Sequence, residues 1–261
     1  MEYLIAIDSD GTLRHSDGTI TEKTKEIVKK VINKGNVVVV CTARPRYHTL
    51  KVSSELGADD YLISSNGTEI YDNINKKIIW ASYIENNDCE KLYKYATSNN
   101  IRIMFVLENT EYVTEFTRNE NQILLSDNNI NDVLNGKVKQ IMVIGKEKHK
   151  IRNFQYKVEN EYHMNILDSS NDLKEEIWFS IVSNEASKGI ALIKLCEYLQ
   201  IPIENTIVFG NDKNDISMFR VASKSVAVSN ASKIALNNAK EITDSNDNDG
   251  VANYLEKHFN L

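Results

Sequence analysis

The sequence predicts an α/β fold: a doubly wound, Rossmann-like core with a mostly parallel sheet, interrupted by an inserted α+β domain. At both ends of the chain, short apolar runs typical of strands buried on both faces alternate with amphipathic helical stretches. The middle of the chain instead has the apolar–polar alternation of half-exposed strands. We therefore assign residues 1–82 and 182–261 to the core and residues 83–181 to the insertion.

The first predicted strand is the run Leu-Ile-Ala-Ile over residues 4–7, which is followed directly by Asp8 and Asp10. Thr21 can cap a helix over residues 22–34, and Gly35 ends it. A second buried strand over residues 36–41 contains four consecutive valines. A strand, a helix and a strand with a short return form a βαβ unit, so we expect these two strands to be parallel.

The core continues with a helix over residues 47–56, a strand over 61–64 and a hairpin formed by 69–72 and 77–82. In the insertion we expect helices over 85–98 and 147–159, and strands over 101–107, 112–116, 138–144 and 162–167. Residues 119–135 are polar and favour short helical pieces. The alternation on one face predicts an antiparallel sheet with helices on one side.

A strand over residues 177–182 leads back to the core. The helix that follows, over 188–199, has an apolar stripe of Ile190, Ile193, Cys196 and Leu199. We then expect a strand over 206–209, a helix over 216–222, a last parallel strand over 225–228, and helices over 233–239 and 250–259.

Composition excludes several classes of function. The 261 residues carry a formal net charge of −6 without a basic tract, which argues against a nucleic-acid partner. We expect no membrane association, because no apolar segment approaches spanning length and the N-terminus lacks a signal pattern. Cys41, Cys89 and Cys196 are too far apart in sequence for a metal-ligand motif, and an odd number of cysteines suits a reduced cytoplasm. We expect a cytoplasmic protein in which Cys41 and Cys196 are small core residues; the sequence carries no signal for its oligomeric state.

Polar turns follow three of the predicted buried strands, and a lysine opens a helix. The turns contain Asp8 with Asp10, Thr42 with Arg44, and residues 210–215; the lysine is Lys188. The first turn can be explained locally, since Asp-x-Asp-Gly is a common turn sequence, and so can the Asn-Gly pair at residues 66–67. Ligands of open α/β sheets nevertheless gather at the carboxyl ends of the strands, where these groups converge if the strands share one sheet. Paired carboxylates suit Mg²⁺, and the whole set suits phosphoryl transfer through an aspartyl-phosphate.

Four segments in order resemble the motifs of the haloacid dehalogenase superfamily, specifically the Cof-like phosphatases with a large α/β cap. They are Asp8-Ser9-Asp10-Gly11-Thr12-Leu13, Thr42 in Cys41-Thr42-Ala43-Arg44-Pro45, Lys188 in Ser187-Lys188-Gly189, and the run from Gly210 to Asp215. Residues 64–67 and 244–252 also resemble recurring stretches of this subgroup. The resemblance covers essentially the whole chain.

The resemblance implies a role for each matching residue. Asp8 would be the nucleophile, and Asp10 the general acid and then the base. Thr42 and Lys188 complete the catalytic set by binding the phosphoryl oxygens. The implied substrate-binding residues are Thr42, Arg44, Asn66, Gly67, Lys188 and Asn214, and the implied Mg²⁺ ligands are Asp8, Asp10 (through its backbone carbonyl), Asn211 and Asp215.

The fourth motif departs from the family pattern, because Asn211 occupies the position that is usually Asp. An Asn can bind Mg²⁺ through its carbonyl oxygen but brings no charge. We expect Asn211 to be a direct ligand, with Asp215 behind it or sharing the metal through water, while Asp212 is another candidate to compensate.

The resemblance implies a Mg²⁺-dependent phosphatase of small phosphorylated metabolites. Sugar phosphates are the first candidate class, and the phosphates of cofactors such as pyridoxal or flavin remain open. A phosphomutase or phosphotransferase would use the same intermediate with a different acceptor. A third hypothesis is a non-catalytic binding protein on this scaffold, which Asn211 favours and the presence of Asp8, Asp10, Thr42 and Lys188 opposes.

Overall fold

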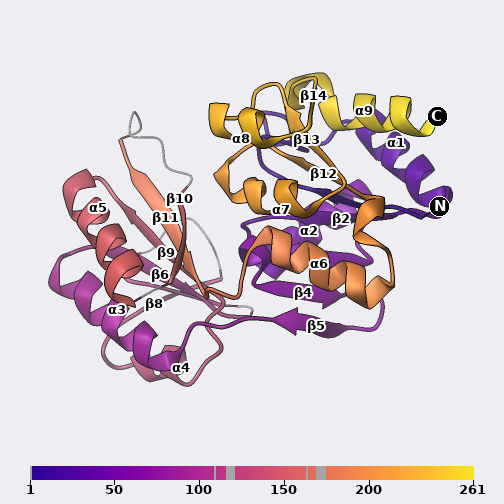
Figure 1. Cartoon of the computed structure of the whole chain (residues 1–261). Coiled ribbons are helices and arrows are strands. Elements are labelled where there is room, and N and C mark those ends of the chain that lie inside the picture. The colour runs from indigo at the N-terminus through magenta and orange to yellow at the C-terminus, as the bar shows by residue number, and fades with distance from the viewer. Residues whose placement is uncertain (1, 109, 116–120, 163, 169–174) are drawn as a thin grey trace. The chain divides into compact units, whose positions relative to one another are not determined.

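The computed structural model describes residues 2–108, 110–115, 121–162, 164–168 and 175–261 (Figure 1). The chain divides into two compact units. The core unit consists of the chain up to Trp80 together with Ser187–Leu261, and the inserted unit is Ala81–Ala186. No helix within the described ranges combines the length and the apolar character that a membrane span requires.

The core unit contains a sheet with eight described strands in the order β14-β13-β12-β1-β2-β3-β4-β5. The strands are β1 (Leu4–Ile7), β2 (Val37–Cys41), β3 (Tyr61–Ser64), β4 (Glu69–Asp72), β5 (Lys77–Ala81), β12 (Thr206–Gly210), β13 (Lys224–Val228) and β14 (Glu241–Thr243). Neighbours from β14 to β3 pair in parallel, whereas β3 and β4 are antiparallel. The prediction of a mostly parallel, doubly wound sheet is confirmed.

Helices cover both faces of this sheet (Figure 1). Ile5 and Ile7 of β1 belong to the core cluster formed with α1 (Glu22–Asn33), α2 (Arg46–Leu56) and α9 (Gly250–Phe259). Leu4 and Ala6 belong to the cluster formed with α6 (Lys188–Leu199), α7 (Ile216–Val221) and α8 (Lys233–Asn238). Both faces of β1 are therefore buried, which explains why its sequence is apolar without alternation.

The predicted apolar stripe of α6 was wrong except for Cys196. The buried apolar side chains of this helix are Ala191, Leu192, Leu195 and Cys196, whereas Ile190, Ile193 and Leu199 are only partly buried. The first two turns of α6 are apolar on several sides, so residue spacing alone did not identify the side that faces the sheet.

Strand β1 lies where the chain order of the sheet reverses, between β2 and β12. Ile7 at its end is in register with Val40 of β2 and with Phe209 of β12. The residues that follow these three strands therefore emerge side by side at one edge. In an open α/β sheet this is the topological switch point, where ligands bind.

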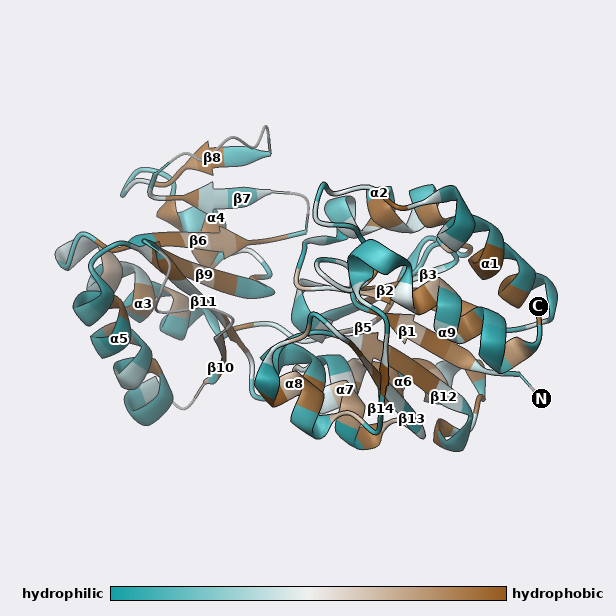
Figure 2. Ribbon diagram, turned by 90° about the horizontal axis from the view of Figure 1, so that it is seen from above, coloured by the Kyte–Doolittle hydropathy of each residue, from teal (hydrophilic) through white to brown (hydrophobic). Residues whose placement is uncertain are grey.

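The inserted unit has a sheet with six described strands in the order β10-β11-β9-β6-β7-β8. Its strands are β6 (Arg102–Val106), β7 (Glu111–Val113), β8 (Gln122–Leu124), β9 (Gln140–Gly145), β10 (Asn165–Asp168) and β11 (Ile177–Val182); its helices are α3 (Asn86–Ser98), α4 (Ile130–Leu134) and α5 (Lys148–Lys157). Helices α3 and α5 lie on one face (Figure 2), where Leu92 and Phe154 pack with Phe105 and Phe179.

Two short strands were missed by the sequence analysis. β8 lies within the segment expected to be helical or irregular, and it runs parallel to β7, so the inserted sheet is mixed rather than wholly antiparallel. β14 extends the core sheet beyond the strand expected to be its last parallel one. Each has only three residues and exposed apolar side chains, Ile123 and Leu124 in β8 and Ile242 in β14, so neither offers a readable alternation. The predicted ends at Phe116 and Asn119 lie outside the described residues.

Candidate active site

Asp8 is the first residue after β1, and it is buried. Its backbone N–H donates to the carbonyl of Phe209 at 3.0 Å, which continues the parallel pairing with β12. Its Oδ2 accepts a hydrogen bond from Thr12 Oγ1 at 3.0 Å, and its Oδ1 accepts one from Lys188 Nζ at 2.6 Å. The structure thus brings together two residues that are 180 positions apart in sequence.

Lys188 opens α6 behind the N-cap Ser187, and its side chain is fully buried. A cation is unfavourable at the positive end of a helix. The compensation is a pair of carboxylates, because Nζ lies 2.6 Å from Asp8 Oδ1 and 2.6 Å from Asp215 Oδ1.

Two buried carboxylates therefore share one ammonium group. Burial is the largest effect on Asp8 and raises its pKa to about 7; Lys188 opposes this rise and Asp215 adds to it. Burial disfavours the charged form of Lys188, but Asp215 and Asp8 raise its pKa well above the ordinary lysine value. With both carboxylates ionised, these three side chains carry one more negative than positive charge.

The turn after β12 is built around Asp215, which is fully buried. Asp215 Oδ2 accepts hydrogen bonds from the backbone N–H groups of Asn211 at 2.8 Å and Asp212 at 3.0 Å. Gly210 is required here, because a Cβ at this position would lie 2.5 Å from Asp215 Cβ. Since Asp215 Oδ1 is bound to Lys188, both carboxylate oxygens of Asp215 already have partners.

Asn211 lies against the turn that follows Asp10. A Cβ at Gly11, whose φ is +78°, would lie 2.4 Å from Asn211 Nδ2. The residues at this edge fit Mg²⁺, because a carboxylate, a backbone carbonyl and an amide are the oxygen ligands that this ion accepts. Within the described part of the chain, no three His, Cys, Asp or Glu side chains gather as a metal site. The implied direct ligands include a single carboxylate side chain, that of Asp8, so they are not a group of that kind.

Asp10 forms a bidentate ion pair with Arg44. Arg44 Nε lies 2.6 Å from Asp10 Oδ2 and Nη2 lies 2.7 Å from Oδ1, while Arg14 Nη1 lies 3.6 Å from Oδ1. The hydrogen bonds to Asp10 raise the pKa of Arg44. The guanidinium expected to contact substrate is thus bound to the candidate acid–base, and half of the Asp10 side chain is exposed.

Thr42 follows β2 and is buried. Its carbonyl accepts the backbone N–H of Asn66 at 2.9 Å, and its Oγ1 accepts that of Arg44 at 3.3 Å. Asn66 has a left-handed backbone (φ +60°), and its Oδ1 accepts a hydrogen bond from Asn214 Nδ2 at 3.0 Å. Three candidate substrate-binding residues from three segments, Thr42, Asn66 and Asn214, are therefore linked.

Gly67 has φ +86° and lies against the backbone that precedes α6: a Cβ at this position would be 2.4 Å from the carbonyl oxygen of Ser187. This close approach joins the loop after β3 to the N-terminus of α6. Gly67 therefore contributes close backbone packing beside Lys188.

Two asparagines that the sequence analysis did not single out hold the first loop. Asn230 Nδ2 donates to the carbonyl of Gly11 at 2.9 Å, and Asn230 Oδ1 accepts the backbone N–H of Asn246 at 3.0 Å. Asn246 Nδ2 in turn donates to the carbonyl of Arg14 at 2.9 Å. The resemblance of residues 244–252 to a recurring stretch was the only available signal for this role.

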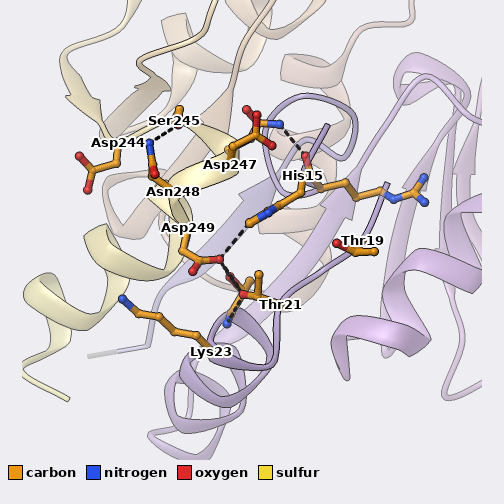
Figure 3. Close-up of polar contacts among 12 residues, drawn as sticks. His15, Thr19, Thr21, Lys23, Asp244, Ser245, Asp247, Asn248 and Asp249 are labelled. Atoms are coloured by element: carbon orange, nitrogen blue, oxygen red, sulfur yellow. Dashed lines mark hydrogen bonds and ion pairs between the residues drawn. The ribbon is translucent and has the colours of Figure 1, made fainter. Parts of the chain in front are cut away.

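The stretch over residues 244–252 also binds residues 15–21, which follow the first loop (Figure 3). Asp249 Oδ1 accepts Thr21 Oγ1 at 2.6 Å and lies 3.2 Å from His15 Nε2. Asp247 accepts the backbone N–H and the hydroxyl of Ser16, each at 2.7 Å. His15 therefore helps to anchor the segment that leaves the site.

Cys41 is the last residue of β2 and is fully buried. Burial raises the pKa of its thiol to about 12. The neutral thiol is a poor nucleophile, so Cys41 is a packing residue, as predicted.

Comparisons with known proteins agree with this geometry. A family model described as haloacid dehalogenase-like hydrolase matches residues 5–255. A protein of Buchnera aphidicola subsp. Acyrthosiphon pisum, whose name calls it a phosphatase, is 32% identical over 273 residues, covering 99% of this chain and 97% of that protein. A 5-amino-6-(5-phospho-D-ribitylamino)uracil phosphatase of Bacillus subtilis (strain 168) is 27% identical over 266 residues, covering 99% and 96%.

Solved structures show the same fold. TM0651 from Thermotoga maritima has a TM-score of 0.84 at 21% identity, covering 98% of this chain and 97% of its own. A sugar phosphatase of HAD subclass IIB has a TM-score of 0.83 at 19% identity and covers 99% of both chains. On the match of nearly its whole length to the family model and to these relatives, the chain belongs to the haloacid dehalogenase-like hydrolases.

Proposed function

We propose that this protein is a Mg²⁺-dependent phosphatase that hydrolyses small phosphorylated metabolites through an aspartyl-phosphate on Asp8. One observation carries the proposal: a buried carboxylate at the switch point of the sheet is held by a buried lysine, and Asp10 follows it two residues later. The relatives are named as phosphatases, which supports the same class of reaction.

In the first step, an oxygen of Asp8 attacks phosphorus and the bond from phosphorus to the ester oxygen breaks. Asp10 donates a proton to the departing alkoxide, which is a poor leaving group without it. In the second step, Asp10 removes a proton from water, and this water attacks the phosphoenzyme and releases Asp8 and inorganic phosphate. Dividing one difficult displacement into two easier ones is the advantage of the covalent intermediate.

Lys188, Thr42 and Asn214 would bind the phosphoryl oxygens, and the contact of Lys188 with Asp8 keeps the nucleophile in one orientation. Arg44 would contact substrate after releasing Asp10, while Asn66 and Gly67 support this side of the pocket.

The carboxylate of Asp8, the backbone carbonyl of Asp10 and the amide of Asn211 would hold Mg²⁺, with Asp215 behind them fixing the turn. When bound, the ion supplies positive charge that offsets the repulsion between Asp8 and the phosphate.

The inserted unit would act as a cap that selects the substrate and excludes water during transfer. Two of the similar proteins, the sugar phosphatase and the ribitylamino-uracil phosphatase, are named for substrates that carry a phosphorylated, hydroxyl-rich carbon chain. We therefore propose phosphate esters of sugars or sugar alcohols as the substrate class.

The test begins with p-nitrophenyl phosphate and Mg²⁺, comparing the wild type with Asp8→Asn. The proposal predicts phosphate release by the wild type, loss of release on chelation, and none from Asp8→Asn. A panel of sugar and sugar-alcohol phosphates is then assayed for released phosphate and for isomerised product. Isomer formation without phosphate release would indicate a mutase, and no turnover with any divalent metal would indicate a binding protein.

A further inference from the structure

The candidate metal site offers few oxygen atoms that are free to bind an ion. Three donors already hold Asp215, with Oδ1 bound to Lys188 and Oδ2 to the N–H groups of Asn211 and Asp212, so we place it behind the direct ligands. Asp8, the other carboxylate of the buried pair, has two donors, Lys188 at Oδ1 and Thr12 at Oδ2. Asp8 is therefore the only charged side chain among the direct ligands proposed above.

Asn211 occupies the position that is usually Asp. A carboxylate there would be a second negatively charged ligand beside Asp8. The backbone N–H of Asn211 is fixed by Asp215 at 2.8 Å, and its side-chain amide lies beside Gly11, the residue after Asp10. The amide can offer an oxygen to a cation but brings no negative charge. An ion at this position would gain coordination from Asn211 but no charge compensation.

The ion pairs at this edge are already balanced without a metal. Asp8 and Asp215 contact Lys188, and Asp10 contacts Arg44 and Arg14. These contacts join three negative and three positive side chains; Asp212 and the exposed Lys213 add one charge of each sign. A divalent ion would leave an excess of two positive charges, and a dianionic phosphate would remove that excess.

We propose that Asn211 makes the binding of the divalent ion and of the phosphate strongly interdependent, so that neither binds tightly without the other. The inference rests on the proposed function and concerns how the same site is loaded. Because coupling between two ligands is reciprocal, phosphate raises the affinity for the ion by the same factor as the ion raises the affinity for phosphate. The free protein then holds its nucleophile without a resident metal, and the substrate itself completes the site.

The experiment uses Mn²⁺ as a paramagnetic replacement for Mg²⁺, and inorganic phosphate. Free Mn²⁺ is measured by electron paramagnetic resonance with and without phosphate, and protein-free samples correct for Mn²⁺–phosphate complexes. For the wild type, we expect phosphate to tighten Mn²⁺ binding by about tenfold or more, within the usual range of ligand coupling. Calorimetric titration of phosphate with and without Mn²⁺ must return the same factor, and this check requires no variant.

Asn211→Asp adds the missing charge while keeping the side-chain size. This variant should bind Mn²⁺ alone about tenfold more tightly than the wild type, and the effect of phosphate should fall to about threefold or less. Lys213→Gln is the matched control: it changes the net charge of the same turn by the same amount at an exposed position, and should leave Mn²⁺ binding within about twofold of the wild type.

Equal Mn²⁺ affinity of the wild type with and without phosphate would overturn the inference, as would an Asn211→Asp variant that behaves like Lys213→Gln. If these results come from a protein that hydrolyses p-nitrophenyl phosphate, the proposed function stands and only the coupling is wrong. If neither Mn²⁺ nor phosphate binds and no phosphate is released, the proposed function fails with it.

Discussion

The candidate active site at the edge of the core sheet and the face of the inserted sheet opposite α3 and α5 are built on opposite principles. At the candidate site, charged side chains fix one another: Lys188 lies 2.6 Å from both Asp8 and Asp215, and Arg44 lies 2.6 Å from Asp10. On the inserted sheet, Phe105 and Val143 face α3 and α5. The residues that alternate with them, such as Met104, Met142 and Ser180, form the second face, where they are in register.

The second face is mostly uncharged. Met142 is paired with Met104 on one side and with Ser180 on the other. Gln140 Nε2 donates to Ser180 Oγ at 3.2 Å. The side chains proposed to perform chemistry are thus constrained by mutual charge, whereas the second face, which we propose as the part of the cap that selects the substrate, depends on packing and a few hydrogen bonds. Mutations should therefore have large, shared effects at the first region and small, selective effects at the second.

The largest expected effect is that of Asp8→Asn. Replacing the nucleophile should lower kcat by about four orders of magnitude or more, because Asp215, the other buried carboxylate of this cluster, is held by Lys188 and two backbone N–H groups. The measurement is phosphate release, with circular dichroism and urea unfolding as the control for an intact fold. Activity within an order of magnitude of the wild type would contradict the covalent mechanism and remove the distinction between the two regions.

The next effect is on stability. Lys188→Ala leaves Asp8 and Asp215 buried without their shared cation, which should destabilise the protein by about 3–5 kcal/mol. Lys194→Ala is the matched control, because Lys194 lies on the same helix and pairs with Glu197 at the surface, where such a pair contributes about 0–1 kcal/mol. Urea unfolding of both variants tests this, and equal losses would mean that the buried cluster is not constrained by charge.

Met142→Ala tests the second face. Because Met142 is only partly buried, its truncation should cost less than the roughly 3–5 kcal/mol expected for Phe154→Ala on the helix-covered face. Hydrolysis of p-nitrophenyl phosphate should be nearly unchanged, while the ratio of kcat/KM between two sugar phosphates should shift by about tenfold or less. A uniform fall for every substrate would place Met142 outside the selecting surface.

The smallest effect concerns the anchor of the first loop. Burial raises the pKa of Asp249, but hydrogen bonds from Thr21, His15 and Thr24 outweigh it and hold this pKa below the ordinary value. The ionised carboxylate therefore stabilises the folded state above about pH 4, and this contribution is lost as the pH falls toward the folded-state pKa. Asn keeps the left-handed backbone that residue 249 requires.

Asp249→Asn should accordingly be less stable than the wild type at pH 6, and the difference should shrink as the pH is lowered below about 4. Urea unfolding across this range measures it. A difference that stays constant with pH would show that Asp249 acts by packing alone.

The two regions also differ in how far the sequence could predict them. The edge formed by Asp8, Thr42, Lys188 and the 210–215 turn was predictable, because parallel strands align their carboxyl ends and each segment carries its own charged or hydroxyl residue. The core strands were equally readable, since four consecutive valines have few alternatives.

Other features depend on partners that no local pattern reveals. The pairing of Arg44 with Asp10 joins residues 34 positions apart, and both could equally have faced solvent or substrate. Asn230 and Asn246 support the first loop through backbone carbonyls, which any sequence presents. The three-residue strands β8 and β14 are defined by their neighbours rather than by their own residues.

The most direct test of the account is whether phosphate becomes attached to Asp8. Asp10→Asn removes the base of the second step, so the phosphoenzyme should accumulate when p-nitrophenyl phosphate, whose leaving group needs no proton, is supplied with Mg²⁺. Acid quenching followed by peptide mass spectrometry should find a phosphoryl adduct on Asp8. An Asp10→Asn protein that turns over this substrate while no adduct is ever trapped, or an adduct found on another residue, would contradict the central claim.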